Sequence, residues 1–331
     1  MAFYMENIEE LKVENQTTVT SFILLGFSHL AKLQLLLFVV TLLMFLVTMM
    51  GNFLIVAITI IYPVLHTPMY YFLKNLALIE ICYSLCIVPR MLVNLLVGRK
   101  AISFSACALQ LNGVILFVTS ECFLLGAMAY DRHVAICHPL HYATIMSKRL
   151  CIQIVAGCWL SGVSVAVGFT SWLFSFPFCG SKEINHFFCD VSPVLKLVCA
   201  DTSLFELVIF IDIVIIVMVP FFFISVSYIH IIYAILQIPS PEGRHKAFST
   251  CAAHLVVVTL FYSTAGIIHL RPKSNLSSNS KKLVSLSYTV VTPMLNPIIY
   301  SLRNKEVKES LRRLFGLGMF MERPSILPLA R

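Results

Sequence analysis

Residues 204–237 read LFELVIFIDIVIIVMVPFFFISVSYIHIIYAILQ, a run in which Glu206 and Asp212 are the only acidic side chains and no lysine or arginine occurs. A helix of about 20 predominantly apolar residues can cross the roughly 30 Å hydrocarbon core of a bilayer. The run therefore predicts a membrane-spanning helix. Counting outward from it gives seven such stretches, near residues 33–61, 68–97, 104–130, 151–178, 204–237, 247–270 and 283–302.

The composition of the whole chain agrees with a membrane protein. Of its 331 residues 59% are hydrophobic and only 12% are charged, which is more apolar surface than one water-soluble core of this size could bury. The net charge of +8 is scattered between the apolar stretches, so it favours anionic lipid and an intracellular partner over nucleic acid. We predict an all-α, seven-transmembrane helix bundle.

The connections between spans are short, apart from the stretch from Cys179 to Phe205, so we predict a single domain over residues 1–331. It would comprise an extracellular tail (1–32), the transmembrane bundle (33–302) and a cytoplasmic tail (303–331). In that tail one helical face gathers the apolar side chains of Val307, Leu311, Leu314 and Phe315. This pattern favours a short amphipathic helix lying on the membrane; the alternative is a frayed tail with ordinary charge patterning.

Orientation rests on covalent features, because lysine and arginine fall almost evenly on the two sides and the positive-inside rule decides little. The polar start of the chain does not read as a signal peptide, and Asn15-Gln16-Thr17 is a glycosylation sequon. One cysteine begins the third span and three lie in the long loop, namely Cys107, Cys179, Cys189 and Cys199. Four cysteines allow three pairings. Both features place the N-terminus outside a plasma-membrane protein with several spans.

At the inner end of the third span, residues 128–142 read MAYDRHVAICHPLHY. This run resembles the MAYDRYVAICxPLxY signature of odorant receptors of tetrapod-type class II, which are rhodopsin-like G-protein-coupled receptors, with His133 in place of the usual tyrosine. Residues 65–73 (LHTPMYYFL), 246–255 (KAFSTCAAHL) and 293–300 (PMLNPIIY) match the same family, as do Gly51-Asn52 and Ser227-Tyr228. Residues 261–264 (FYST) replace the tryptophan and proline of most rhodopsin-like receptors, as they do in odorant receptors.

The resemblance implies a receptor and not an enzyme, with no cofactor. A small, mostly apolar volatile molecule would bind within the bundle and activate a heterotrimeric G protein of the stimulatory or olfactory type, which raises cyclic AMP. One alternative is a receptor of the same fold for a non-odorant metabolite outside the nose. Another is a transporter or intramembrane enzyme, for which we would expect internal repeats or interrupted helices; the sequence shows neither.

By resemblance, the ligand contacts come from spans three, five, six and seven. Tyr262, Ala265, Gly266 and His269 recur at helical spacing, although such stripes also suit ordinary packing. Asp212 would meet a hydrogen-bond donor or a cationic odorant, or else pair with His269 inside the protein. The predicted pocket comprises Val114, Ile115, Val118, Thr119, Cys122, Asp212, Ile216, Tyr262, Ala265, Gly266, His269 and Thr289.

By resemblance too, the activation switch comprises Asp131, Arg132, Tyr228, Asn296, Pro297 and Tyr300. Arg132 would be held by Asp131 at rest and released towards the two tyrosines in the active state. The alternatives are that Arg132 reaches anionic headgroups and that Pro297 only kinks its helix.

Carboxylates inside spans are rare and usually functional. By resemblance, Glu80 and Glu121 form a buried polar or ion site with Asn52 and Asn296; the alternative is a protonated carboxylic acid hydrogen-bonded in the interior.

The resemblance also suggests the disulfides Cys107–Cys189 and Cys179–Cys199. Residues 186–190 (HFFCD) resemble a loop motif proposed to bind copper, but Cys189 cannot be a ligand while it is oxidised, so we predict no metal site.

Overall fold

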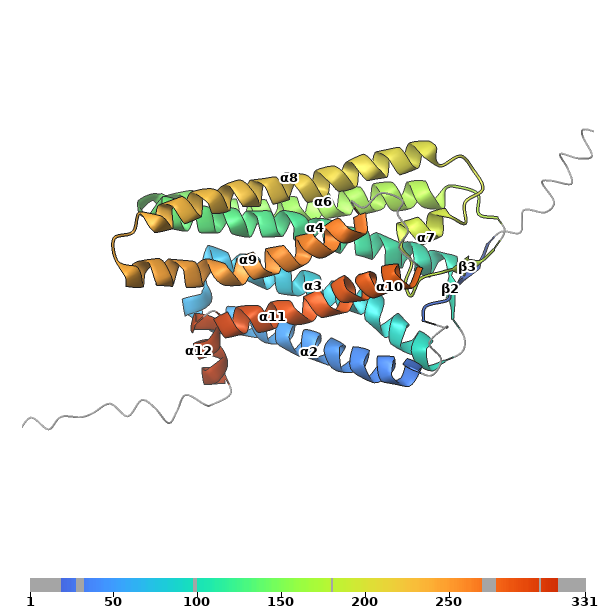
Figure 1. Ribbon diagram of the computed structural model, residues 1–331, viewed down its shortest axis with the longest axis horizontal. Coiled ribbons are helices and arrows are strands. Elements are labelled where there is room, and N and C mark those ends of the chain that lie inside the picture. The colour runs from blue at the N-terminus through green and yellow to red at the C-terminus, as the bar shows by residue number, and fades with distance from the viewer. Residues whose placement is uncertain are drawn as a thin grey trace, which may run out of the picture.

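The computed structural model describes residues 19–27, 33–97, 100–179, 181–269, 278–303 and 305–314. Seven helical segments in this part of the chain are long and apolar enough to cross a membrane, and they run side by side as one bundle (Figure 1). The first six are α2 (Gln34–Ile61), α3 (Pro68–Leu96), α4 (Phe104–Cys137), α6 (Lys148–Phe174), α8 (Ser203–Leu236) and α9 (Pro241–His269). The seventh is built from α10 (Ser278–Leu286), η4 (Ser287–Val291) and α11 (Thr292–Arg303). The predicted seven-helix membrane fold is confirmed.

Burial separates central helices from peripheral ones. In the most apolar stretches of α3 and α4, 61% and 56% of residues are buried, against 22% in both α2 and α8. The exposed side chains of α2 and α8 are nevertheless large and apolar, as Leu35 and Phe222 illustrate. An apolar surface of this extent suits hydrocarbon as the surrounding solvent. The helices α3 and α4 therefore form the interior of the bundle.

Two helices are longer than the apolar pattern predicts, and one ends earlier. Helix α4 continues past residue 130 to Cys137, and α9 begins at Pro241, before the apolar stretch starts. Both extensions carry charged or polar side chains, and a helix can continue where its side chains reach water. Helix α6 ends at Phe174, short of residue 178, because Pro177 cannot continue a helix.

A small sheet closes one end of the bundle, which we call the sheet end. Strand β1 (Ser21–Leu24) lies between β2 (Ala101–Ser103), to which it is antiparallel, and β3 (Glu183–Ile184), to which it is parallel. The sequence analysis predicted no strand here, since the partners come from three distant segments. The sheet packs the start of the described chain onto the loops that precede α4 and follow α6.

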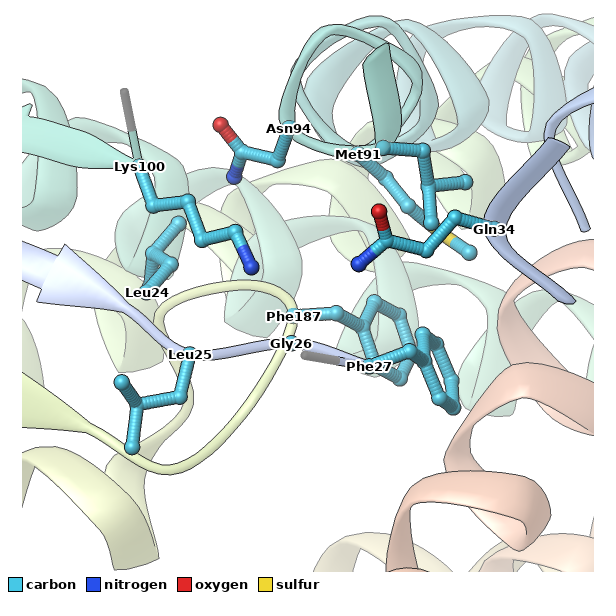
Figure 2. Close-up of a pocket in the computed structure, with 10 residues that line it drawn as sticks. Leu24, Leu25, Gly26, Phe27, Gln34, Met91, Asn94, Lys100 and Phe187 are labelled. Carbon is cyan, nitrogen blue, oxygen red and sulfur yellow. The ribbon is translucent and has the colours of Figure 1, made fainter. Parts of the chain in front are cut away.

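Gly26 lets the chain turn inward after β1. Its φ of +52° is left-handed, a conformation that favours glycine. The Gly26 amide donates to the carbonyl of His186 at 3.0 Å, and the Gly26 carbonyl accepts from Lys282 Nζ at 2.6 Å. Next to it the Phe27 and Phe187 rings stack, and Asn94 points its amide into a cavity of about 10 Å³ (Figure 2). The segment thus ties the long loop to the seventh span.

The opposite end carries α12 (Lys305–Leu314), which runs across the bundle axis (Figure 1). Val307 and Ser310 are buried, while Lys308 and Glu309 are exposed. The predicted short amphipathic helix after the seventh span is therefore present. Phe315 lies outside the described residues, and so does the rest of the predicted tail. We call this the α12 end.

Helices α4 and α6 approach closely at Gly162. A Cβ added there would meet Ser120 Oγ and would lie 2.6 Å from the carbonyl oxygen of Leu116. We predict that Gly162→Ala lowers the free energy of unfolding by about 1–3 kcal/mol, because overpacking forces the helices apart. Thermal unfolding of the purified protein measures this. Gly157→Ala on the same helix is the control, since a Cβ there meets nothing within 4 Å; equal melting of both variants would contradict the prediction.

Candidate functional site

The candidate ligand site is a cavity of about 90 Å³ near the sheet end of the bundle. Helices α4, α6, α8 and α9 contribute its walls, together with Asp190 and Val191 of the long loop and Tyr288 in η4. This is smaller than the roughly 300–1,000 Å³ of pockets for drug-sized ligands, so it suits a compact molecule. Eight of the residues predicted from the sequence line it: Val114, Ile115, Val118, Thr119, Cys122, Asp212, Ile216 and Ala265.

Two carboxyl groups, those of Asp190 and Asp212, lie in the described wall. Asp212 on α8 is half-buried and faces the cavity, and Asp190 lies at the N-cap of α7 (Val191–Leu195), where its Oδ1 accepts from the Val191 amide at 2.9 Å. The side chain of His269 lies outside what the structure describes, so the alternative pair with Asp212 stays a prediction. The sequence analysis did not assign Asp190. An acid directly after a loop cysteine is the signal that could have pointed to it.

Three predicted contacts lie elsewhere. Tyr262 is buried one turn deeper, where its hydroxyl donates to the Cys122 carbonyl at 3.1 Å. Thr289 is fully buried and bonds back to the Ser285 carbonyl at 2.7 Å. Gly266 is not part of the described wall.

Tyr288 lines the cavity in place of Thr289. Residues 287–291 form a π-helical turn, which inserts one extra residue per turn and shifts the face that each later side chain occupies. The resemblance had indicated Thr289, the next residue along the chain.

A second cavity of about 30 Å³ lies against the first, sharing Val118, Ala265 and Tyr288 with it. Glu121 and Thr292 are among its walls, and Glu121 is 7% exposed. Glu121, which was predicted to share a buried polar site with Glu80, thus faces the space next to the candidate ligand cavity.

Glu80 forms a polar centre between three helices. Its Oε2 accepts from Asn52 Nδ2 at 3.4 Å, and its Oε1 accepts from Asn296 Nδ2. All three side chains are at most 2% exposed. Asn52 also donates to the Thr48 carbonyl at 3.0 Å. The predicted grouping of Asn52, Glu80 and Asn296 thus joins α2, α3 and α11.

The structure contains disulfides between Cys107 and Cys189 and between Cys179 and Cys199. Beside the first, Gln110 accepts from the Cys189 amide at 2.9 Å and donates to the Cys86 carbonyl at 3.0 Å. The long loop is therefore held to α3 and α4 next to the candidate cavity.

His186, of the proposed copper motif, is buried in the long loop, and its Nε2 lies 3.2 Å from Ser285 Oγ. Burial lowers the pKa of this histidine, which favours the neutral ring. No cluster of three potential metal ligands occurs in the described ranges.

At the α12 end, Asp131 accepts a hydrogen bond at 2.8 Å from the hydroxyl of Tyr142 in α5 (Tyr142–Ile145). Burial and the nearby carboxylate raise the pKa of Tyr142, so the hydroxyl remains a donor. Oδ2 of Asp131 and Nε of Arg132 are buried without a hydrogen-bond partner among the described residues. The carboxylate therefore accepts from a loop tyrosine, and its resting pair with Arg132 stays a prediction.

The two switch tyrosines also differ in their partners. The hydroxyl of Tyr228 lies 2.7 Å from Nδ1 of the fully buried His254 on α9. The hydroxyl of Tyr300 is buried with no hydrogen-bond partner in the described part of the chain. Pro297 lies within α11 and contacts the position of Gly51. His254 stands in the quoted motif at 246–255, yet the sequence analysis gave it no role.

We predict that Glu80→Leu lowers the free energy of unfolding by about 1–3 kcal/mol, because the Asn296 amide loses its buried acceptor. Thermal unfolding in detergent measures the loss. Glu80→Gln, which keeps a carbonyl oxygen for Asn296, should lose less. A leucine variant as stable as the original would show that this centre does not hold the helices together.

Comparison with known proteins identifies the family. The sequence profile described as "Olfactory receptor" matches residues 41–317. Human Olfactory receptor 10A7 is 54% identical over 300 residues, which cover 91% of this chain and 95% of that protein. Human Olfactory receptor 10A4 is 55% identical over 302 residues, covering 91% and 96%. Human Olfactory receptor 10R2 is 48% identical over 314 residues, covering 95% and 94%. The chain therefore belongs to the olfactory receptor family of G-protein-coupled receptors, and its function is that of an odorant receptor.

Proposed function

We propose that the 90 Å³ cavity is the odorant site and that the receptor raises cyclic AMP through a G protein of the stimulatory or olfactory type. The single observation that carries the site is an apolar cavity with Asp212 in its wall, placed between the long loop and the helices. A cavity lined mainly by apolar side chains with a few polar anchors suits a small volatile molecule. The odorant is released chemically unchanged.

The proposed orientation puts the sheet end outside the cell, in the plasma membrane. Both disulfides lie at this end, and disulfides form and persist in oxidising compartments. The sequon at Asn15 lies outside the described residues, but it precedes β1, which belongs to the same end. The α12 end then faces the cytoplasm and the G protein.

The proposed resting state is held at the α12 end by two contacts. The hydroxyl of Tyr142 donates to the Asp131 carboxylate, and the hydroxyl of Tyr228 lies within hydrogen-bond distance of His254 Nδ1. Activation would exchange these partners and bring Arg132 towards Tyr228 and Tyr300. An odorant favours that exchange only to the extent that it binds the active arrangement more tightly.

We expect Asp212→Asn to weaken responses to amine odorants by about 10- to 100-fold, because a hydrogen bond to a charged group contributes about 1.5–3 kcal/mol. Responses to neutral volatiles should change little. Cyclic AMP is measured across amines, acids and neutral volatiles in cells that express the receptor and an olfactory-type G protein.

Glu206→Gln is the matched control, since Glu206 lies on the same helix in its first turn and outside the cavity wall. An unchanged amine response in Asp212→Asn would remove Asp212 from ligand recognition. Silence of the original receptor across the panel, despite verified surface expression, would favour the receptor for a non-odorant metabolite.

We expect Tyr142→Phe to raise basal cyclic AMP about fivefold, because losing a bond of about 1 kcal/mol destabilises the resting state by that amount. Tyr233→Phe, which removes a hydroxyl from an exposed position on α8, serves as the control. The measurement is cyclic AMP without odorant at matched surface expression. A basal level equal to that of the original receptor would show that the Tyr142–Asp131 bond does not hold the resting state.

A further inference from the structure

A further cavity lies at the α12 end, away from the proposed odorant site. It is a groove of about 650 Å³, compared with about 90 Å³ for the candidate odorant cavity. The end of α2, the connection after it, the start of α3 and the start of α6 form its walls. We call this the basal groove. Its lining residues are Thr59, Ile60, Leu65, His66, Thr67, Pro68, Tyr70, Tyr71, Lys74, Met146, Lys148, Cys151 and Ile152.

The basal groove carries basic side chains in its walls and no acidic ones among the described lining residues. Lys74 and Lys148 face it together with His66, and no lining residue is aspartate or glutamate. Lys74 is half-buried, and its Nζ lies 5.2 Å from the centre of the Tyr71 ring. Lys148 is exposed and begins α6, whose N-terminus adds further positive potential. Two lysines on different helices thus line the basal groove.

Glu306 on α12 lies outside the described lining of the groove and accepts a hydrogen bond from the hydroxyl of Tyr70. This bond holds α12 against α3 beside the groove.

Part of the remaining wall is apolar and exposed. Ile60 is 60% exposed and Ile152 is 46% exposed, and both line the groove. The neighbouring Ile61 and Val64 are also exposed. A site that is basic at the membrane surface and apolar below it matches a molecule with an anionic head and acyl chains.

We propose that the basal groove binds an anionic phospholipid of the inner leaflet, with a multiply phosphorylated headgroup between Lys74 and Lys148 and its acyl chains against Ile60 and Ile152. Two lysines and a histidine favour a head with more than one negative charge over a singly charged one. The proposal rests on the orientation given under the proposed function. It does not depend on the odorant.

The test is native mass spectrometry of the detergent-purified full-length receptor, with dioctanoyl phosphatidylinositol bisphosphate as the probe. We expect the Lys74→Gln/Lys148→Gln variant to bind the probe about 25-fold more weakly, at about fivefold for each lysine near an anionic surface. Lys308→Gln is the control, because Lys308 is exposed on α12 and lies outside the groove wall. Its binding should equal that of the original receptor, and thermal unfolding verifies that each variant is folded.

Two further probes decide what the site recognises. Dioctanoyl phosphatidylserine, with one net negative charge, should bind more weakly than the bisphosphate lipid, and inositol trisphosphate, which lacks acyl chains, should bind weakly as well. Equal binding of the free headgroup would overturn the lipid assignment, and equal loss in Lys308→Gln would overturn the site. Because neither odorant nor G protein is present, a receptor that is silent in the cyclic AMP assay leaves this result unaffected.

Discussion

The hydrocarbon core of the membrane offers no hydrogen-bond partner, and this constraint shapes the molecule. Backbone groups must be satisfied within each segment, so the apolar stretches can only be helices. Polar side chains meet the same demand: Thr48 and Thr59 donate to carbonyls of their own helix at 2.8 Å. A carboxylate cannot be satisfied in that way, because it has no donor to offer when ionised. Glu80 therefore has to find donors on neighbouring helices, and it finds the amides of Asn52 and Asn296.

That requirement divides the bundle into two parts. Glu80 joins α2, α3 and α11, and the same helices approach closely where a Cβ at Gly51 would lie 2.9 Å from the Pro297 side chain. On the other side, Pro220 lies inside α8, just as Pro89 and Pro297 lie inside α3 and α11, so an interrupted hydrogen-bond ladder occurs on both sides. The difference between the two sides is the polar centre itself, which links α2, α3 and α11. The polar centre thus favours movement of α8 and α9 over movement of α2 and α11.

Features of this receptor that depend on a short stretch of sequence could be predicted, whereas contacts between distant segments could not. Apolar length alone located all seven spans, and the motif at 128–142 indicated the family. The strand β1 could not be foreseen, because its partners at Ala101 and Glu183 are brought together only by the folded chain. Tyr288 was missed because the residues that face the cavity in a π-turn cannot be read from the sequence. The hydrogen bond from Tyr142 to Asp131 was not predicted either, because Tyr142 reaches the carboxyl group from the following connection.

The connection between the proposed odorant site and the proposed switch follows from the continuity of α4. Val114 and Cys122 line the cavity and Asp131 lies on the same unbroken helix; the nine residues from Cys122 to Asp131 span about 14 Å at 1.5 Å per residue. The Cys122 carbonyl accepts from Tyr262 of α9, whose ring packs on Phe221 beside Pro220 of α8. A ligand that moves this junction therefore acts on three helices together. Since Asp131, Tyr228 and His254 are carried by those same helices, displacing α8 and α9 against α4 changes which partners they can reach.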